Sequence, residues 1–263
     1  MKYGGNAMVN DQIKHSVMQN VLKLHQAGHQ VIIVHGGGPF INRILDQVKI
    51  TSEFIGGHRK TSPEAMRYIE MTLVGEVNTS LVTLLGKLGG KAVGISGKDG
   101  RLAMAKPRFH QEEGKQPVDL GQVGDISQIN PEVIHDLLDK NYIPVIACVA
   151  ADETGNTYNI NADMMAGAVA GALKADVYCV LTDVDGLMMD KDDKSSLISN
   201  LNYAELKPLF GKVIVGGMIP KIESCQIALD QGAKSARIIN GTAENALSQA
   251  LIDHQPIGTI IIK

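Results

Sequence analysis

The sequence of 263 residues has no tryptophan and only three cysteines, Cys148, Cys179 and Cys225. The cysteines are too far apart for a metal-binding motif, and they form no disulfide framework of the kind found in small secreted proteins. The sequence also lacks an apolar run of the roughly eighteen residues that a membrane helix needs, and no signal-peptide core stands at its start. We therefore expect a protein of the reducing cytoplasm that enters no membrane and buries its cysteines.

An excess of charge of one sign is also missing. With 25 lysines and arginines against 28 aspartates and glutamates, the formal net charge is −3. A protein that binds nucleic acid usually carries a basic excess that neutralises phosphates, so we expect no nucleic-acid partner. The hydrophobic fraction of 44% is typical of a globular domain.

Several catalytic signatures are absent as well. The sequence has no Walker-type G-x-x-x-x-G-K-[ST] loop, no G-x-G-x-x-G dinucleotide fingerprint, no protein-kinase signature and no G-x-S-x-G nucleophile elbow. The eight histidines show no paired metal-ligand spacing. These absences argue against covalent and metal-hydrolytic catalysis, and we expect no metal bound by protein ligands.

Segments of strand and helix character alternate along almost the whole sequence. Short apolar runs predict strands at residues 30–34, 92–95, 143–149, 176–182, 235–239 and 258–262. Helical spacing predicts a helix through Ile13, Val17, Val21 and Leu24, and further helices at residues 39–48, 63–74, 79–88, 131–140, 163–173, 203–210, 219–231 and 243–252. This alternation is typical of an α/β fold, so we expect a three-layer αβα sandwich around a mostly parallel open sheet.

The segment from Arg101 to Gln128 interrupts the alternation. Its alternating polar and apolar residues, two prolines and several glycines predict a hairpin. No internal repeat or polar linker separates the chain into independent domains. We expect two lobes that share one continuous sheet, residues 1–174 and residues 175–263, with ligands at the carboxyl ends of the strands.

The first candidate site is the glycine run Gly36-Gly37-Gly38, which follows an apolar strand and His35 and precedes a helix-patterned segment. Glycines let the backbone approach a phosphoryl group closely, and the N-terminus of a helix favours its negative charge. An ordinary strand-to-helix turn usually needs only one glycine, so the run favours an anion-binding loop. The ordinary turn is the alternative.

Two lysines stand beside other glycine pairs. Lys2 precedes Gly4-Gly5, and Lys221 follows Gly216-Gly217 in the first turn of a predicted helix. A cation in the first turn of a helix is electrostatically unfavourable, and a bound polyanion would compensate for it. The alternative is that both lysines are solvated charges without a function.

Polar residues also precede the predicted helix at residues 163–173. In an extended segment, alternation would point Asn159, Asn161 and Asp163 to one side, where they would face a cleft. The alternative is that Asp163 caps the helix while the two asparagines form turns.

Two more segments carry residues that suit a ligand. The loop that starts at Asp183 leaves a predicted strand at its carboxyl end, although any turn would use the same residue types. Arg59 offers a planar fork that matches a carboxylate, although surface arginines are common. Neither feature alone decides between a ligand site and ordinary structure.

Six motifs in this order are more specific than any one of them. They are Lys2-x-Gly4-Gly5-Asn6-Ala7-Met8, His35-Gly36-Gly37-Gly38, Gly57-x-Arg59-x-Thr61, Gly94-Ile95-Ser96-Gly97-Lys98-Asp99-Gly100, Asn159-x-Asn161-Ala162-Asp163 and Gly216-Gly217-Met218-x-x-Lys221. In these motifs the chain resembles the amino-acid kinase family from residue 2 to its last predicted strand, and within it the branch that phosphorylates N-acetyl-L-glutamate. The resemblance implies the amino-acid kinase fold and transfer of the γ-phosphoryl group of MgATP to the side-chain carboxylate of N-acetyl-L-glutamate, a step of arginine biosynthesis.

The resemblance also implies roles for individual residues. Lys2 and Lys221 would neutralise charge on the phosphoryl group, and Asp163 would orient both lysines. The remaining implied roles are phosphoryl binding by Gly5, Gly37 and Gly38, substrate binding by Gly37, Gly38, Arg59, Asn159 and Asn161, and nucleotide binding by Asp183, Val184, Asp185, Gly186, Leu187, Met188, Val213, Ile214 and Val215. Residues 1–174 would carry the acyl-amino-acid site and the dimer contact, and residues 175–263 the nucleotide site.

The chemistry of such a reaction agrees with the residues present. A glutamate-type carboxylate has a pKa of about 4.3 and is ionised at neutral pH, so it needs no general base. The reaction needs cancellation of the repulsion between a carboxylate and a polyphosphate, which lysines and backbone N–H groups supply. No carboxylate of the sequence is an evident metal ligand, so Mg²⁺ would be held largely by nucleotide phosphates and water.

Alternatives are other acceptors within the same family, namely carbamate, aspartate, glutamate and UMP, or a non-catalytic ligand sensor with the same fold. Almost nothing precedes Lys2 in the predicted first strand, so we expect low activity if that strand frays. Members of the family that arginine inhibits carry an extra N-terminal helix, which this sequence does not show. We therefore expect a homodimer that is insensitive to arginine.

Overall fold

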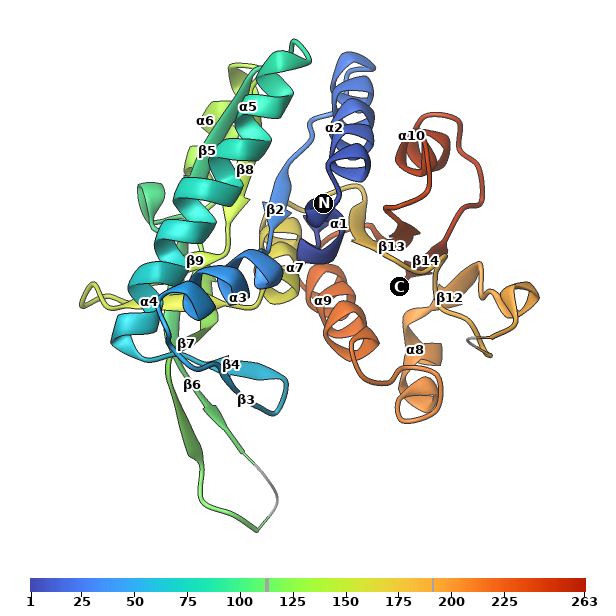
Figure 1. Ribbon diagram of the computed structural model, residues 1–263. Helices are drawn as coiled ribbons and strands as arrows, with labels where there is room; N and C mark the ends of the chain where they lie inside the picture. The colour runs from blue at the N-terminus through green and yellow to red at the C-terminus, as the bar shows by residue number, and fades with distance from the viewer. Residues whose placement is uncertain (112–113, 191) are drawn as a thin grey trace.

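The computed structural model describes residues 1–111, 114–190 and 192–263, except the side chain of Asn6. Its centre is an eight-stranded sheet in which neighbouring strands run parallel, apart from the antiparallel pair β13 and β14 (Figure 1). In spatial order the strands are β12 (Asn200–Asn202), β14 (Thr259–Ile262), β13 (Ser235–Asn240), β11 (Tyr178–Thr182), β1 (Lys2–Tyr3), β2 (Ile33–His35), β8 (Ile143–Ala147) and β5 (Ala92–Ser96). The prediction of a mostly parallel sheet is confirmed.

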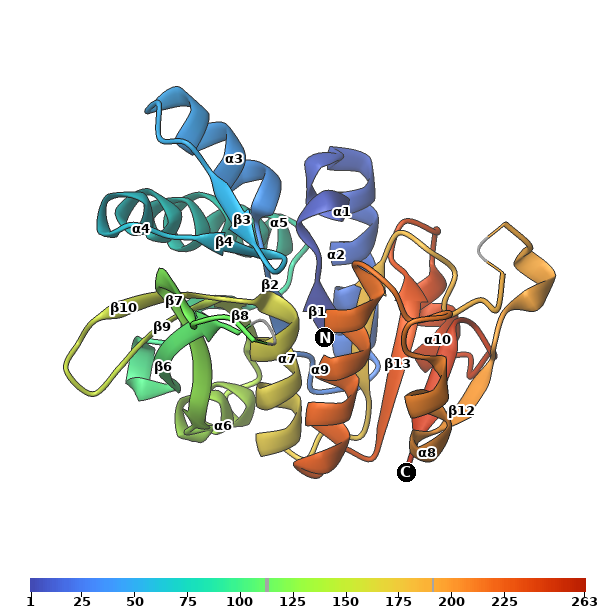
Figure 2. The same cartoon turned by 90° about the horizontal axis from the view of Figure 1, so that it is seen from below.

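Helices cover both faces of the sheet. On one face, α2 (Asp11–Gln26), α5 (Thr79–Lys87) and α10 (Ala246–Leu251) bury one apolar cluster. On the other face, α6 (Glu132–Asp139), α7 (Ala162–Ala172) and α9 (Met218–Asp230) bury a second cluster. Figure 2 shows α2 on one side of β1 and both α7 and α9 on the other. The predicted three-layer sandwich is confirmed by this arrangement.

Helix α2 illustrates how the sequence builds one of these layers. The side chain of Asn10 accepts hydrogen bonds from the N–H groups of Gln12 and Ile13 and so caps the helix. Val17, Val21 and Leu24 are buried at helical spacing. The helix that this spacing predicts is confirmed.

A smaller set of strands lies beside the main sheet. β6 (Ala103–His110) and β7 (Val118–Ile129) form the predicted hairpin, which projects from the body of the molecule (Figure 1). Residues 112 and 113, which the prediction included, lie outside the described residues. β9 (Val149–Ala151) and β10 (Thr157–Ile160) pair with this hairpin and close the set into a ring.

The structure corrects three predicted segments. The helix predicted at residues 63–74 is α4 (Pro63–Glu70), which continues into a π-helix, η1 (Met71–Asn78). The strand predicted at residues 143–149 is interrupted between β8 and β9. The helix predicted at residues 203–210 is a single turn, α8 (Tyr203–Leu206), followed by a 3₁₀ turn, η4 (Lys207–Leu209), because Pro208 has no N–H to donate.

Four elements lack a clear signal in the sequence. α1 (Gly5–Val9) starts with a glycine, which disfavours helix. β12 is only three residues long, and the hairpin of β3 (Glu53–Ile55) and β4 (His58–Lys60) is mostly exposed and lacks apolar alternation. Its turn residues Gly56 and Gly57 have φ of 55° and 79°, which glycine adopts without steric cost.

The strands β2, β1 and β11 are neighbours at the centre of the sheet. Their carboxyl ends lead into α3 (Gly38–Gln47), into α1 and into the loop that starts at Asp183. Because parallel strands end at the same edge of a sheet, these three connections lie together. Among the described residues, no helix is long and apolar enough to cross a membrane.

Candidate active site

The loops that follow β1 and β2 touch each other. A Cβ atom on Gly5 would lie 2.9 Å from Cδ of Pro39 and 3.1 Å from the backbone nitrogen of Gly38. A Cβ atom on Gly37 would lie 2.6 Å from a methyl group of Leu73. A side chain therefore does not fit at Gly5, and one at Gly37 would have to displace the side chain of Leu73. Because the first N–H groups of a helix have no acceptor within it, the start of α3 presents backbone donors at this contact.

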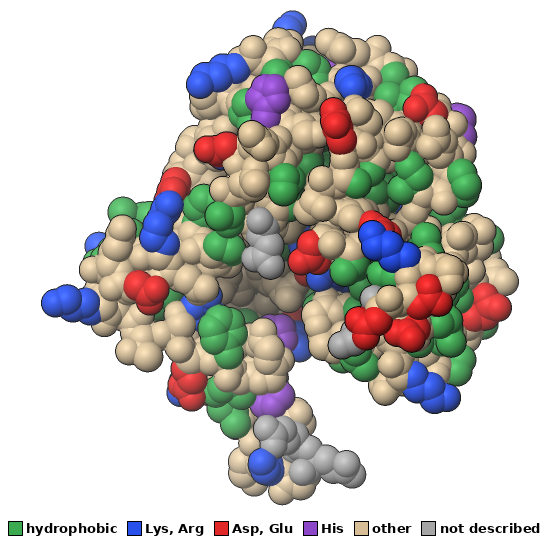
Figure 3. All heavy atoms as spheres, turned by 45° about the vertical axis from the view of Figure 1, so that its right-hand side comes forward, with side chains coloured by type: hydrophobic (Ala, Val, Ile, Leu, Met, Phe, Trp, Pro, Cys, Tyr) green, Lys and Arg blue, Asp and Glu red, His purple; other side chains and the backbone are tan. Residues whose placement is uncertain are grey.

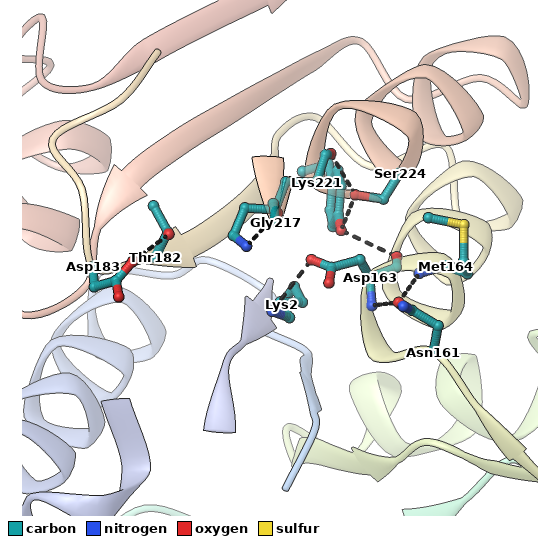
Figure 4. Close-up of polar contacts among 10 residues, drawn as sticks. Lys2, Asn161, Asp163, Met164, Thr182, Asp183, Gly217, Lys221 and Ser224 are labelled. Carbon is teal, nitrogen blue, oxygen red and sulfur yellow. Dashed lines mark hydrogen bonds and ion pairs between the residues drawn. The ribbon is translucent and has the colours of Figure 1, made fainter. Parts of the chain in front are cut away.

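Lys2 and Asp163 form a buried ion pair beside these loops (Figure 4). Nζ of Lys2 lies 3.2 Å from Oδ1 of Asp163, and the two side chains are 9% and 10% exposed. Lys2 comes from β1 at the centre of the sheet, and Asp163 comes from the first turn of α7. The pair thus joins two segments that are far apart in the sequence.

Lys221, on α9, directs its ammonium group toward the same region. Burial lowers the pKa of Lys221, and the positive charge of Lys2 lowers it further, while Asp163 and Asp183 oppose this shift. Figure 4 shows Lys221 between Asp163 and Asp183. The two lysines that the sequence singles out therefore lie close enough to interact.

The contacts of Lys221 differ from the expected ones. Its Nζ donates a hydrogen bond to the carbonyl oxygen of Gly217, at 2.9 Å. Within the described residues Asp163 forms an ion pair with Lys2, and none within 4.0 Å with Lys221. Asp163 therefore contacts Lys2 directly but not Lys221, because Lys221 turns back to the N-terminal end of its own helix.

The polar residues before α7 also differ from their predicted arrangement. Asn159 is half-buried in β10, but the helix starts at Ala162, so Asp163 does not continue the strand alternation. Oδ1 of Asn161 accepts hydrogen bonds from the N–H groups of Asp163 and Met164, at 2.8 and 3.3 Å. Asn161, and not Asp163, is therefore the N-cap, and this leaves the Asp163 carboxylate available to Lys2.

Two residues without a signal in the sequence connect the helices that carry Asp163 and Lys221. The buried hydroxyl of Tyr178 donates to Oγ of Ser224 at 3.1 Å and lies 3.4 Å from the carbonyl oxygen of Asp163. The Ser224 hydroxyl donates to the carbonyl oxygen of Lys221 at 2.7 Å (Figure 4). A Cβ atom on Gly167 would lie 2.5 Å from the carbonyl oxygen of Ser224, so α7 and α9 are in close backbone contact.

Arg59 is 8% exposed and has neutral hydrogen-bond partners. Its guanidinium donates to Oγ of Ser52 and to Oδ1 of Asn42, and it lies over the ring of Phe54 at 4.6 Å from the centroid. Burial lowers the pKa of Arg59. Within the described residues no carboxylate pairs directly with this cation, so it is free to pair with an anionic ligand.

The predicted nucleotide residues lie in two connections near the carboxyl end of β11. Asp185 accepts a hydrogen bond from Nδ2 of Asn240, at 2.7 Å, and this bond lowers the pKa of Asp185. Asp183 is exposed, whereas Leu187 and Ile214 are buried in the core. Leu187 and Ile214 are 1% and 0% exposed as whole residues, so in this structure neither presents a surface to a nucleotide.

One face of the molecule is hollowed near its middle. Figure 3 shows a hollow in the middle of one face, with lysine, arginine and acidic side chains around it. In the part of the chain that the structure describes, no three histidine, cysteine, aspartate or glutamate residues are grouped to hold a metal ion. The site therefore offers cations and backbone donors for an anion.

Known proteins resemble this chain in both sequence and fold. A sequence model of the amino acid kinase family matches residues 1–240. The chain belongs to the amino acid kinase family. It is 46% identical to an acetylglutamate kinase of Heliobacterium modesticaldum, over 100% of this chain and 91% of that protein, and 46% identical to an acetylglutamate kinase of Desulfitobacterium hafniense, over 99% and 89%. A Streptococcus mutans protein of known structure is 27% identical, with a TM-score of 0.78 over 99% of this chain and 96% of that chain.

Membership of the amino acid kinase family confirms the predicted fold class and identifies the chain as a kinase. It also supports the use of ATP, since kinases of this family are phosphotransferases. The roles of individual residues and the division into two lobes at residue 174 stay predictions.

Proposed function

We propose that this kinase transfers the γ-phosphoryl group of ATP to the side-chain carboxylate of N-acetyl-L-glutamate, a step of arginine biosynthesis. The observation that carries this proposal is 46% identity to acetylglutamate kinases over the whole chain. The convergence of Lys2, Lys221 and the glycine loops supports it independently, because these groups suit a phosphoryl transfer.

The acceptor carboxylate is ionised at neutral pH and attacks without a general base. The main barrier is the repulsion between this carboxylate and the polyphosphate, followed by the charge spread over the phosphoryl oxygens. Lys2 and Lys221 would neutralise that charge, with Asp163 holding Lys2 in place. Backbone N–H groups of Gly5, Gly37 and Gly38 would bind the phosphoryl oxygens.

Arg59 would bind a carboxylate of the acyl-amino acid that does not react. Its buried guanidinium has the neutral hydrogen-bond partners Asn42 and Ser52 and feels the charge of Asp46 only at longer range, so a carboxylate ligand would supply a direct counter-charge. Asn159 would contribute its side-chain amide, and Asn161 the amide nitrogen that its capping role leaves available.

The nucleotide would bind beside α9, at the Asp183–Met188 and Val213–Val215 segments. Asp183 lies on the far side of Lys221 from Asp163 and is exposed (Figure 4). Mg²⁺ would enter with ATP, held by phosphates and water, because the described residues offer no dedicated set of metal ligands. The same resemblance supports a homodimer, which sedimentation would measure.

The proposal is tested by ADP release with N-acetylglutamate, compared with glutamate, aspartate, carbamate and UMP under the same conditions. We expect N-acetylglutamate to give the largest kcat/KM by a wide margin. Comparable or faster turnover with another acceptor would assign the chain to that acceptor. Tight ATP binding without ADP release from any acceptor would support the ligand-sensor alternative.

A further inference from the structure

His35 is a completely buried histidine without a role in the proposed reaction. It is the last residue of β2, directly before the glycine run, and its exposed fraction is 0%. In the register of the sheet it lies between Tyr3 of β1 and Ala147 of β8. A polar ring at this depth needs hydrogen-bond partners, because an unpaired buried polar group is costly.

Both ring nitrogens of His35 have partners, and these partners define the protonation of the ring. Nδ1 lies 2.9 Å from the carbonyl oxygen of Gly36, which can only accept, so Nδ1 carries a proton. Nε2 lies 3.0 Å from Nδ2 of Asn78. That same Nδ2 is 2.8 Å from the carbonyl oxygen of Val145, so the amide nitrogen is the donor and Nε2 accepts. The ring is therefore neutral, and burial keeps it so by lowering its pKa to about 4.

The surroundings hold Asn78 in place. Asn78 ends the π-helix η1, and π-helical turns occur frequently at functional sites. A Cβ atom on Gly94 would lie 1.9 Å from Oδ1 of Asn78, so β5 has a glycine where this side chain enters the sheet. Leu73 of the same π-helix is the residue that packs against Gly37. One element thus contacts both His35 and the glycine run.

We propose that His35 is a positioning residue for the phosphoryl-binding glycines: by holding the carbonyl of Gly36, it aims the backbone N–H of Gly37 at the transferred group. In a planar trans peptide the carbonyl of one residue and the N–H of the next point in opposite directions. A hydrogen bond that fixes the Gly36 oxygen therefore fixes the direction of the Gly37 donor. The inference rests on the proposed function, since it takes Gly37 as a phosphoryl ligand.

Two substitutions test the roles of the two ring nitrogens separately. His35→Asn places an amide donor near the position of Nδ1, and His35→Gln places an amide oxygen near the position of Nε2 but loses the donor to Gly36. We expect H35Q to lower kcat about 100-fold, the effect of removing one donor to a developing anion, with a smaller change in KM for the acceptor. H35N should lose far less of kcat, although both variants lose thermal stability.

The control is Asn20→Ala, at a buried polar contact remote from the site. Asn20 is 3% exposed and accepts hydrogen bonds from the N–H and hydroxyl of Ser248, between α2 and α10. This variant should lose stability without a matching loss of kcat. If H35N and H35Q instead lose kcat equally and in proportion to their loss of stability, His35 is only a structural residue and the proposal is wrong.

Two measurements distinguish this proposal from the proposed function. Affinities for AMP-PNP and ADP need no turnover, and we expect H35Q to weaken AMP-PNP more than ADP because only AMP-PNP places a γ-phosphoryl group near Gly37. Equal weakening would overturn the proposal even if the wild-type enzyme phosphorylates N-acetylglutamate. Nitrogen-15 NMR of the wild-type ring at pH 7 should show a neutral ring protonated at Nδ1, and protonation at Nε2 would contradict the inference without any variant.

Discussion

Two lysines and one carboxylate form the charged group around Lys2, and the exposed Asp183 acts on Lys221 from beyond this group. Lys2 and Asp163 form an ion pair, and both side chains are about nine-tenths buried. Removing either partner would leave an unpaired buried charge, which would lower the stability of the fold. Lys221 lies nearby with a backbone carbonyl as its hydrogen-bond partner. The three groups together carry about one net positive charge, and a polyanion is the natural ligand of such a site.

Lys221→Ala should remove transition-state stabilisation and little else. We expect kcat to fall at least about 100-fold, because the charge on the migrating phosphoryl group loses a cation, while the affinity for ATP weakens only mildly. Steady-state kinetics and calorimetry measure the two effects separately. Lys234→Ala is the control, since Lys234 is an exposed lysine paired with Asp176. Unchanged kcat in K221A would remove Lys221 from the catalytic residues.

The neutral ring of His35 predicts a dependence of stability on pH. Its pKa is about 4 in the folded protein, against 6.5 for an unperturbed histidine side chain, so the unfolded chain binds a proton more readily. The free energy of unfolding should be highest above pH 6.5 and fall by up to about 3 kcal/mol as the pH drops from 6.5 toward 4. Urea unfolding at several pH values measures this, and H35N should flatten the curve in that window. A wild-type stability that rises as the pH drops from 6.5 to 4 would contradict the buried neutral ring.

At the scale of the secondary structure, the sequence best predicts the elements whose own apolar residues lie in the core. The strand β11 is buried at every position and shows as an apolar run, and α2 shows its apolar face at helical spacing. The exposed hairpin of β3 and β4 has no such pattern, and its formation depends on the turn at Gly56 and Gly57. Periodicity therefore finds the core of the fold and misses its surface additions.

The candidate site is less predictable because its contacts are long-range. The motifs single out Lys2 and Asp163 as candidate site residues. Their contact depends on the strand order, which places β1 beside β11, the strand that follows the helix of Asp163. The contact of His35 with Asn78 spans 43 residues and depends on a π-helix that covers the end of one predicted helix and the gap before the next. The polar bridge of Tyr178 and Ser224 has no sequence signal, because Tyr178 stands in an apolar strand and Ser224 is one of several polar residues on its helix.

The close contact of α7 and α9 makes Gly167 a sensitive position. In Gly167→Ala the new methyl group would meet the carbonyl oxygen of Ser224 at 2.5 Å and push apart the helices that carry Asp163 and Lys221. We expect a loss of about 1–3 kcal/mol in the free energy of unfolding and a lower kcat. Thermal unfolding and steady-state kinetics measure both.

Gly86→Ala is the matched control for that variant. Gly86 lies in the exposed part of α5, and a Cβ atom there would meet nothing within 4 Å. The substitution should stabilise the protein by about 0.5–1 kcal/mol, because alanine favours helix over glycine, without affecting kcat. If G167A destabilises the protein no more than G86A does, the close contact of the two helices is contradicted.

At the scale of the whole molecule, the two expected lobes share more than a sheet. Each of the two apolar clusters contains residues from both sides of residue 174: one includes Val34 and Ile261, and the other includes Tyr3 and Leu247. The strand β1 pairs with β2 on one side and with β11 on the other. Neither half therefore completes its own core, and the two halves should be stable only together.

This architecture predicts that the chain unfolds in one cooperative transition and that a bound ligand stabilises the whole chain against it. Hydrogen exchange read in β2 and in β13 should give the same opening free energy in denaturant, because each strand belongs to the same core. AMP-PNP at about 100 times its dissociation constant should raise both values by about 2.7 kcal/mol. An opening free energy that rises with ligand in β13 but not in β2 would show instead that residues 175–263 unfold as a separate unit, and the nucleotide would then stabilise that unit alone.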